Sequence, residues 1–172
     1  MPPTIRDAQR SDLAAIADIW NAVIRGSTTT FTTREKTAAT LSDWLTERIR
    51  AGEAVLVAVE GGTVLGFACY FPFRGGPGYR FTKELSIYLR DDQQGKGLGR
   101  ALMAALEARA AQNGIHSLWA GCSATNPGSV EFHRALGFQD IATLPEVGYK
   151  FDQWLDLILL MKPLPQTDTS PE

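Results

Sequence analysis

Three glycines stand close together in the stretch DDQQGKGLGRAL, residues 91–102. Gly95, Gly97 and Gly99 come at the start of a run of strong helix formers that extends over residues 98–112. Glycine lets backbone N–H groups approach a ligand because no Cβ intervenes, and the start of a helix carries about half a positive charge. A phosphate group is the ligand that suits such a turn.

Two familiar nucleotide-binding loops do not fit this spacing. A P-loop needs Ser or Thr after its Gly-Lys pair, but Gly97 follows Lys96, and the dinucleotide fingerprint GxGxxG is replaced by GxGxG. The alternative is a glycine-rich turn that only joins a strand to a helix. The functional interpretation is a phosphate-bearing ligand outside those two nucleotide classes.

The elements that must position this turn follow from hydrophobic periodicity. Apolar residues recur at helical spacing over residues 13–24, with Ser11 in the capping position, and a second helix is expected over 41–51, ended by Gly52. Further helices are expected over 98–112 and 127–136. Strands are expected over 54–60, 63–71, 84–90, 117–122, 138–143 and 154–162. This order predicts an α/β (α+β) domain with a mixed, largely antiparallel central sheet flanked by about four helices.

Composition limits the other possibilities. The chain has 172 residues, 44% of them apolar, and a net charge of −2, which favours one domain and gives no basic excess for nucleic acid or anionic lipid. No apolar run reaches the ~20 residues of a membrane span, so we expect a soluble, cytoplasmic protein. Cys69 and Cys122 lack CxxC spacing and are expected to be reduced core thiols, with no metal site. The domain is expected to cover 1–162, followed by a flexible tail over 163–172.

Four stretches carry a resemblance to a known family. The sequence QGKGLG matches the Gln/Arg-x-x-Gly-x-Gly/Ala signature of the GNAT superfamily of N-acetyltransferases. The runs YRFTKELSIYL, NPGSVEFHRALGF and VGYKFDQWLDL resemble those of the phosphinothricin and methionine sulfoximine acetyltransferases. The chain departs from that pattern at Lys83, where Val is usual, and at Asp152, where Gly is usual. Lys83 is expected to point to the opposite face of its strand from Glu84, which leaves the resemblance intact.

The resemblance implies a single GNAT-like domain with acetyl-CoA as co-substrate. Backbone around Ile87, Tyr88 and Leu89 is expected to meet the pantetheine arm as a substitute strand. The other residues that the resemblance assigns to the coenzyme are Gln94, Gly95, Lys96, Gly97, Leu98, Gly99, Arg100, Asn126 and Ser129.

Acetyl transfer needs a base for the amine, a donor for the oxyanion and a proton for the departing thiolate. By resemblance, Glu84 is the base, although a strand-end glutamate could also lie in solvent or pair with Arg80. His133 is assigned to the thiolate, and Tyr88 is an alternative acid, unless it belongs to the ordinary core.

Recognition of the acceptor is expected from two loops. Arg74 and Arg80 could clamp a carboxylate or phosphinate-like group, together with Glu84, and Phe31 could supply an apolar wall. Both arginines could instead be solvated loop charges. In the run 147–157, Lys150 and Trp154 could line the pocket or a subunit contact.

The sequence therefore predicts an acetyltransferase acting on the α-amine of a small amino acid or analogue. Two alternatives stay open: transfer to a peptide or protein amine, and an acyl-CoA-binding module without turnover. The apolar run 154–161 is long for a half-buried strand. Because enzymes of the family that the chain resembles are commonly dimers, this run predicts a homodimer.

Overall fold

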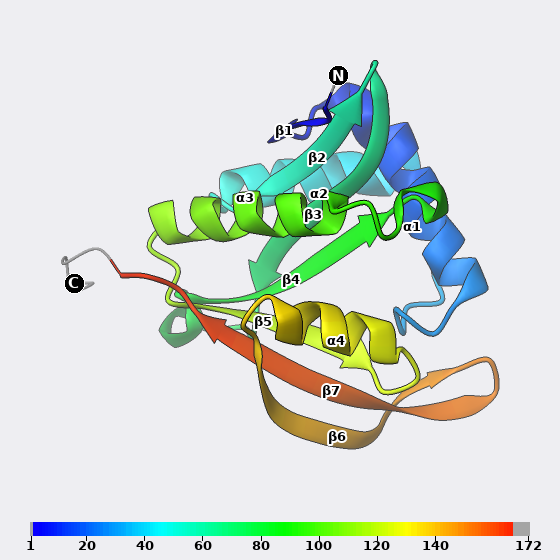
Figure 1. The fold of residues 1–172 in the computed structure, drawn as a ribbon, viewed down its shortest axis with the longest axis vertical. Helices are drawn as coiled ribbons and strands as arrows, with labels where there is room; N and C mark the ends of the chain where they lie inside the picture. The colour runs from blue at the N-terminus through cyan, green and yellow to red at the C-terminus, as the bar shows by residue number, and fades with distance from the viewer. Residues whose placement is uncertain (1, 167–172) are drawn as a thin grey trace.

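The computed structural model describes residues 2–166 and shows one seven-stranded sheet with four α-helices (Figure 1). The helices are α1 (Leu13–Gly26), α2 (Ala38–Arg50), α3 (Leu98–Gln112) and α4 (Pro127–Ala135). The strands are β1 (Thr4–Asp7), β2 (Val55–Glu60), β3 (Thr63–Pro72), β4 (Thr82–Leu89), β5 (Ser117–Ser123), β6 (Gln139–Lys150) and β7 (Gln153–Pro163).

The strands follow the order β1-β2-β3-β4-β5-β7-β6 across the sheet. Every neighbouring pair is antiparallel except β4 and β5, which are parallel. The helices α3 and α4 pack a core that includes Leu102, Leu106 and Val130 on one face, and α1 and α2 pack a second core around Ile16 and Leu41 on the other (Figure 1). The predicted mixed, largely antiparallel sheet is confirmed.

The parallel pair β4 and β5 stays together over only part of its length. Three residue pairs join the strands, from Thr82 with Ser117 to Glu84 with Trp119. Beyond Glu84 the two strands diverge, as Figure 1 shows. From residue 85 onward, β4 is paired along one side only, with β3. The outer backbone groups of β4 therefore face a slot inside the sheet.

The starts of the first two helices differ from the sequence prediction. Ser11 does not cap α1, because it lies in a short 3₁₀ turn at Arg10–Asp12 and the helix begins at Leu13. Helix α2 begins earlier than predicted, at Ala38, because the hydroxyl of Thr37 accepts a hydrogen bond from the N–H of Thr40. Strand β1 was not predicted; it pairs with β2.

The last two strands form a long hairpin. Its turn is Phe151–Asp152, with φ of 53° and 56°, so both residues have the left-handed conformation that glycine adopts most easily. A bulge lies between Leu144 and Gly148, where the N–H of Glu146 donates to Oδ1 of Asp156 at 2.8 Å. The hairpin extends well beyond the helices in Figure 1.

The packed chain continues past the boundary expected at Lys162. Leu164 is buried, and its N–H donates to the carbonyl of His116 at 2.8 Å. The rest of the predicted tail, residues 167–172, lies outside the described residues. None of the helices within 2–166 is both long and apolar enough to cross a membrane.

Both cysteines are buried free thiols, as predicted. Burial raises the pKa of Cys69 to about 12, so its reactive thiolate is suppressed.

Candidate active site

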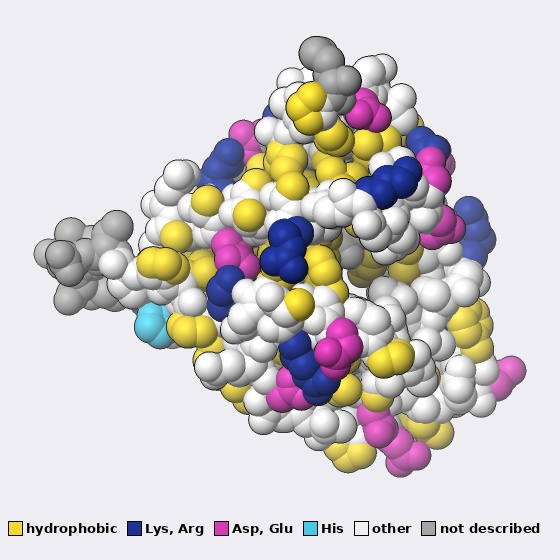
Figure 2. Space-filling model, viewed as in Figure 1, with side chains coloured by type: hydrophobic (Ala, Val, Ile, Leu, Met, Phe, Trp, Pro, Cys, Tyr) yellow, Lys and Arg dark blue, Asp and Glu magenta, His cyan; other side chains and the backbone are white. Residues whose placement is uncertain are grey.

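Two cavities open along β4 and meet at its middle. The α3 cavity, about 560 Å³, lies beside Gln94 and Gly99, and the α2 cavity, about 550 Å³, lies beside Trp44 and Arg48. Five residues line both of them: Thr29, Ile87, Tyr88, Ser129 and His133. Figure 2 shows the surface hollowed between the side of α3 and the side of α4. The slot between β4 and β5 thus joins the α3 cavity to the α2 cavity.

The glycine turn stands at the start of α3. Gly95 and Gly97 have φ of 73° and 82°, and a Cβ built on either would have no atom within 4 Å. The turn is therefore open to a ligand, and the first N–H groups of α3 have no partner within the helix. Gln94 and Gly99 line the α3 cavity, while Leu98 and Arg100 belong to the first turn of the helix. This geometry suits a pyrophosphate held by backbone N–H groups.

Asn126 connects the start of α4 to the opposite wall of the α3 cavity. Its side-chain oxygen accepts from the N–H of Ser129 at 3.3 Å, and Nδ2 donates to Oγ1 of Thr29 at 3.1 Å. Asn126 and Ser129 line that cavity together with Ile87 and Leu89 from β4. The predicted pantetheine-binding residues are thus brought to one channel.

Glu84 stands where β4 separates from β5 and lines the α2 cavity. Burial raises the pKa of its carboxyl above the usual value, which suits a proton acceptor near neutral pH. A Cβ on Gly121 of β5 would lie 3.1 Å from Oε1 of Glu84, so glycine leaves room for the carboxylate there. Lys83 points to the other face, where it pairs with buried Glu53 at 2.6 Å.

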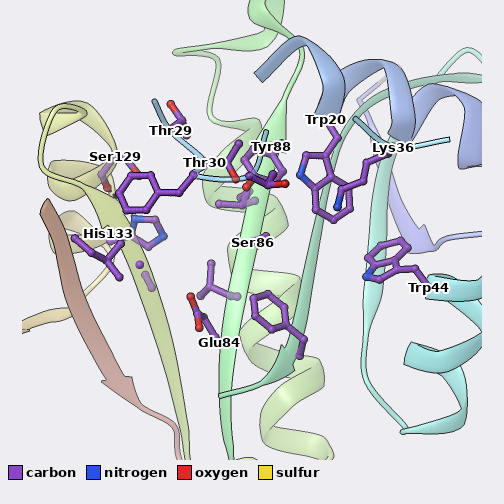
Figure 3. A pocket seen from close by; sticks show the side chains of 18 of the residues that line it. Trp20, Thr29, Thr30, Lys36, Trp44, Glu84, Ser86, Tyr88, Ser129 and His133 are labelled. Atoms are coloured by element: carbon purple, nitrogen blue, oxygen red, sulfur yellow. Dashed lines mark hydrogen bonds between the residues drawn. The ribbon is translucent and has the colours of Figure 1, made fainter. Parts of the chain in front are cut away.

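Tyr88 lies on the same face of β4 as Glu84, as Figure 3 shows. Its ring packs against Trp20 and Phe67, with centroids 5.8 and 5.6 Å away. Burial raises the pKa of the Tyr88 phenol, so the hydroxyl keeps its proton at neutral pH. Tyr88 is thus a core residue that keeps a protonated phenol among the residues lining both cavities.

His133 is held in one tautomer by its own helix. Nδ1 lies 2.8 Å from the carbonyl of Ser129, which can only accept, so Nδ1 carries the proton. Burial lowers the pKa of the imidazole, which favours the neutral ring. Nε2 is buried with no hydrogen-bond partner within residues 2–166. In this state the buried Nε2 of His133 is an acceptor and carries no proton to donate.

Several aromatic rings line the α2 cavity. Trp20 and Trp44 meet edge to face at 5.5 Å, and Phe31 and Phe71 line the same space. Phe31 rests on Gly148, because a Cβ there would lie 2.6 Å from Cε2 of its ring.

Lys150 and Trp154 lie on opposite faces of the β6–β7 hairpin. Lys150 is buried and donates to the carbonyls of Ser27 and Thr30 at 2.6 and 2.9 Å, so it anchors the segment that carries Phe31. Trp154 is 62% exposed beside Tyr149, with centroids 4.9 Å apart. Neither of the two lines the α2 or α3 cavity.

Arg74 and Arg80 lie outside both cavities. Both are exposed in the loop after β3, and Arg80 donates to the carbonyl of Pro77 at 3.2 Å with its guanidinium 4.4 Å from the centroid of the Phe81 ring. Their role as a clamp stays a prediction.

Several lining residues were not predicted as site residues. Trp20 and Trp44 were read only as apolar positions of helices, and Lys36 comes from a polar segment with no motif. Gly121 could have been suspected, because glycine inside a strand often marks a close approach.

Comparison with known proteins agrees with this geometry. The chain is 40% identical over 172 residues to an L-methionine sulfoximine/L-methionine sulfone acetyltransferase of Pseudomonas aeruginosa, with 99% of this chain and 100% of that protein covered. It is 33% identical to a phosphinothricin N-acetyltransferase of Alcaligenes faecalis, covering 97% and 85%. A putative acetyltransferase of Salmonella typhimurium, solved with its cofactor acetyl-CoA, superposes with a TM-score of 0.94 at 35% identity, covering 100% and 99%.

The predicted resemblance is confirmed by these relatives. The family profile described as "Acetyltransferase (GNAT) family" matches residues 16–138, a stretch that runs from α1 through β4, the glycine turn and α3 to the end of α4. Because that match spans most of the chain and holds the turn and all but one of the residues that line the two cavities, the protein belongs to the GNAT family and is an acetyltransferase.

Proposed function

We propose that this enzyme transfers the acetyl group of acetyl-CoA to the α-amine of a small amino acid or analogue. Methionine sulfoximine, methionine sulfone and phosphinothricin are the acceptors that the names of its relatives favour. The observation that carries the proposal is the meeting of two cavities on the unpaired side of β4, with Glu84 on the wall of the α2 cavity where β4 leaves β5.

The α3 cavity suits acetyl-CoA. Its pyrophosphate would lie on the turn from Gln94 to Arg100, where Gly95 and Gly97 leave the backbone open. The pantetheine arm would run between Asn126 on α4 and the free side of β4 at residues 87–89. An amide-bearing chain in that slot can hydrogen-bond to β4 as a missing strand would.

The chemistry would take place at the junction. Glu84 would take a proton from the acceptor ammonium, directly or through water. The neutral amine would then attack the thioester carbonyl, the C–N bond would form and the C–S bond would break, with the oxyanion facing N–H groups of β4. The attacking nitrogen must lose one more proton as the amide forms. The thiolate would take that proton, directly or through Tyr88, which would donate its own proton and recover one from the nitrogen, because His133 carries its proton on the nitrogen that faces Ser129.

The α-amine fits this site better than a lysine amine. Reference pKa values are about 8 for an α-amine and about 10.4 for lysine. One carboxylate therefore produces the neutral nucleophile from an α-amine far more easily.

We also propose a homodimer through the β6–β7 hairpin. Four large apolar side chains there are more than half exposed: Val147, Tyr149, Phe151 and Trp154. An exposed apolar group of this kind is typical of an interface. Light scattering at micromolar concentration should give about twice the 18.8 kDa of one chain, and 18.8 kDa itself would reject the dimer.

Thiol release with a panel of amines tests the function. The three acceptors above should exceed plain methionine, polyamines and lysine-containing peptides in kcat/KM. Best activity on a peptide would favour the peptide or protein alternative, and tight acetyl-CoA binding without thiol release would indicate a binding module.

Glu84→Gln tests the base. Turnover should fall about 10²- to 10⁴-fold while acetyl-CoA binding persists. Unfolding should not explain the loss. A carboxyl whose folded-state pKa is raised contributes stability below its unfolded-state pKa, and this contribution is lost as pH rises through the folded-state pKa. The neutral amide of the variant should therefore match or exceed the native stability at pH 7. Unchanged turnover would make Glu84 a structural residue.

A further inference from the structure

Lys36 lies on the wall of the α2 cavity, away from the junction. It lines that cavity but not the α3 cavity, as do Trp44 and Phe71. In Figure 3, His133 and Ser129 stand on one side of the pocket and Lys36 stands on the other, beside Trp20 and Trp44. Since Glu84 and Lys36 line the same cavity, an acceptor whose amine lies at Glu84 has room to extend its other end toward Lys36.

The fold holds Lys36 in a fixed position. The side chain of Asn21, on α1, donates from Nδ2 to the Lys36 carbonyl at 2.9 Å and accepts from the Lys36 N–H at 2.7 Å. The ammonium lies 4.5 Å from the centroid of the Trp20 ring. Both ends of the residue are thus fixed to the same helix.

The charge of Lys36 has no carboxylate to balance it within residues 2–166. Arg48, on the same wall, differs because it pairs with buried Glu53 at 2.5 Å. Burial and nearby Arg34 lower the pKa of Lys36, so its charge is less well stabilised in the free protein than in water. A half-buried cation of this kind gains most from an anion that enters with a ligand. The alternative is that the lysine stem only covers the face of Trp20.

We propose that Lys36 determines acceptor specificity by binding an anionic group at the far end of the acceptor side chain. The proposal rests on the proposed function, in which the α-amine lies near Glu84. The α-carboxylate shares its carbon with that amine and stays on the same side, so the group that reaches Lys36 is the side-chain terminus. Rings of Trp20, Trp44 and Phe71 would enclose the methylene stem. A phosphinate is such an anion, whereas a sulfone has only neutral oxygens.

The test compares two acceptors that differ in terminal charge. Thiol release is measured with phosphinothricin and with methionine sulfone for the native enzyme, Lys36→Met and Lys36→Arg. Lys36→Met should lower kcat/KM for phosphinothricin about 10- to 100-fold, mainly through KM, as expected for a lost charge-assisted hydrogen bond. For methionine sulfone the change should be less than about threefold. Lys36→Arg should restore most of the phosphinothricin activity.

Arg34→Gln is the matched control. Arg34 lies two residues before Lys36 and carries the same charge, but its side chain lines neither cavity. The variant should leave both acceptors within about twofold of native. Equal losses with both acceptors in Lys36→Met, no loss with phosphinothricin, or the same loss in Arg34→Gln would each overturn the assignment. If the native enzyme acetylates neither compound, the proposed function itself fails; if it acetylates both, these outcomes judge Lys36 alone.

Discussion

The change Gly148→Ala tests whether the C-terminal hairpin shapes the α2 cavity. Gly148 lies in β6 under the ring of Phe31, and an added Cβ would lie 2.6 Å from Cε2 and 2.8 Å from Cγ. Ordinary van der Waals contact begins at 3.4 Å. The ring would therefore have to move by about 1 Å, because strand β6 is held on β7 by its ladder.

The size of the effect follows from what Phe31 touches. Overpacking by one methyl group costs about 1–3 kcal/mol of stability, and the anchors from Lys150 to Ser27 and Thr30 limit how far the segment can relax. Phe31 lines only the α2 cavity, and a 1 Å displacement in a reacting site can cost about 10²-fold in rate. We expect kcat/KM for the acceptor to fall about 10- to 100-fold while KM for acetyl-CoA stays within about twofold.

Thiol release with each substrate varied in turn measures both constants, and urea denaturation measures stability. Phe31→Ala removes all the ring atoms that clash, so the double variant Gly148→Ala/Phe31→Ala should lose less stability than the two single losses added together. Additive losses, or a Gly148→Ala enzyme with native acceptor kinetics, would refute the packing argument.

Three other changes test separate features. Glu84→Gln should remove the acidic limb of the pH–rate profile, because a base with a raised pKa loses activity as pH falls through that pKa; a limb that persists belongs to another group. Gly97→Val should weaken acetyl-CoA binding in calorimetry, since φ of 82° strains a β-branched residue; unchanged affinity would remove the phosphate-loop interpretation. Asp152→Gly should raise the free energy of unfolding in urea by about 0.5–1 kcal/mol, because φ is 56°; a lower value would contradict it.

Local signals predicted most elements of the fold. Helix α3 has the predicted bounds because Gly97 and Gly114, both with positive φ, mark its two ends. Strand β1 was missed because its four residues, Thr4–Asp7, are short and only half-buried and show no alternation. The start of α2 was misplaced because the reciprocal hydrogen bonds of Thr37 and Thr40 precede the apolar run.

Residues of the candidate site were predictable only where one continuous motif carries them. Glu84 and the glycine turn belong to such motifs. Lys36 does not, because its position is set by Asn21, which lies fifteen residues earlier on another element. Arg74 and Arg80 were predicted to bind the acceptor, but the structure places them outside both cavities. The turn Pro77–Tyr79 lies between them in the loop, and no local sequence pattern reveals the direction in which it turns the chain.

The parting of β4 and β5 gives the sheet an open edge in its interior. An open edge at the rim of a sheet invites another chain to pair with it and is a common origin of aggregation. Here the unpaired side of β4 faces β5 across a narrow slot. A single extended chain can lie along this side of β4, whereas the sheet of a second molecule cannot enter. The fold can therefore keep one strand permanently ready to pair without offering it for sheet-to-sheet association.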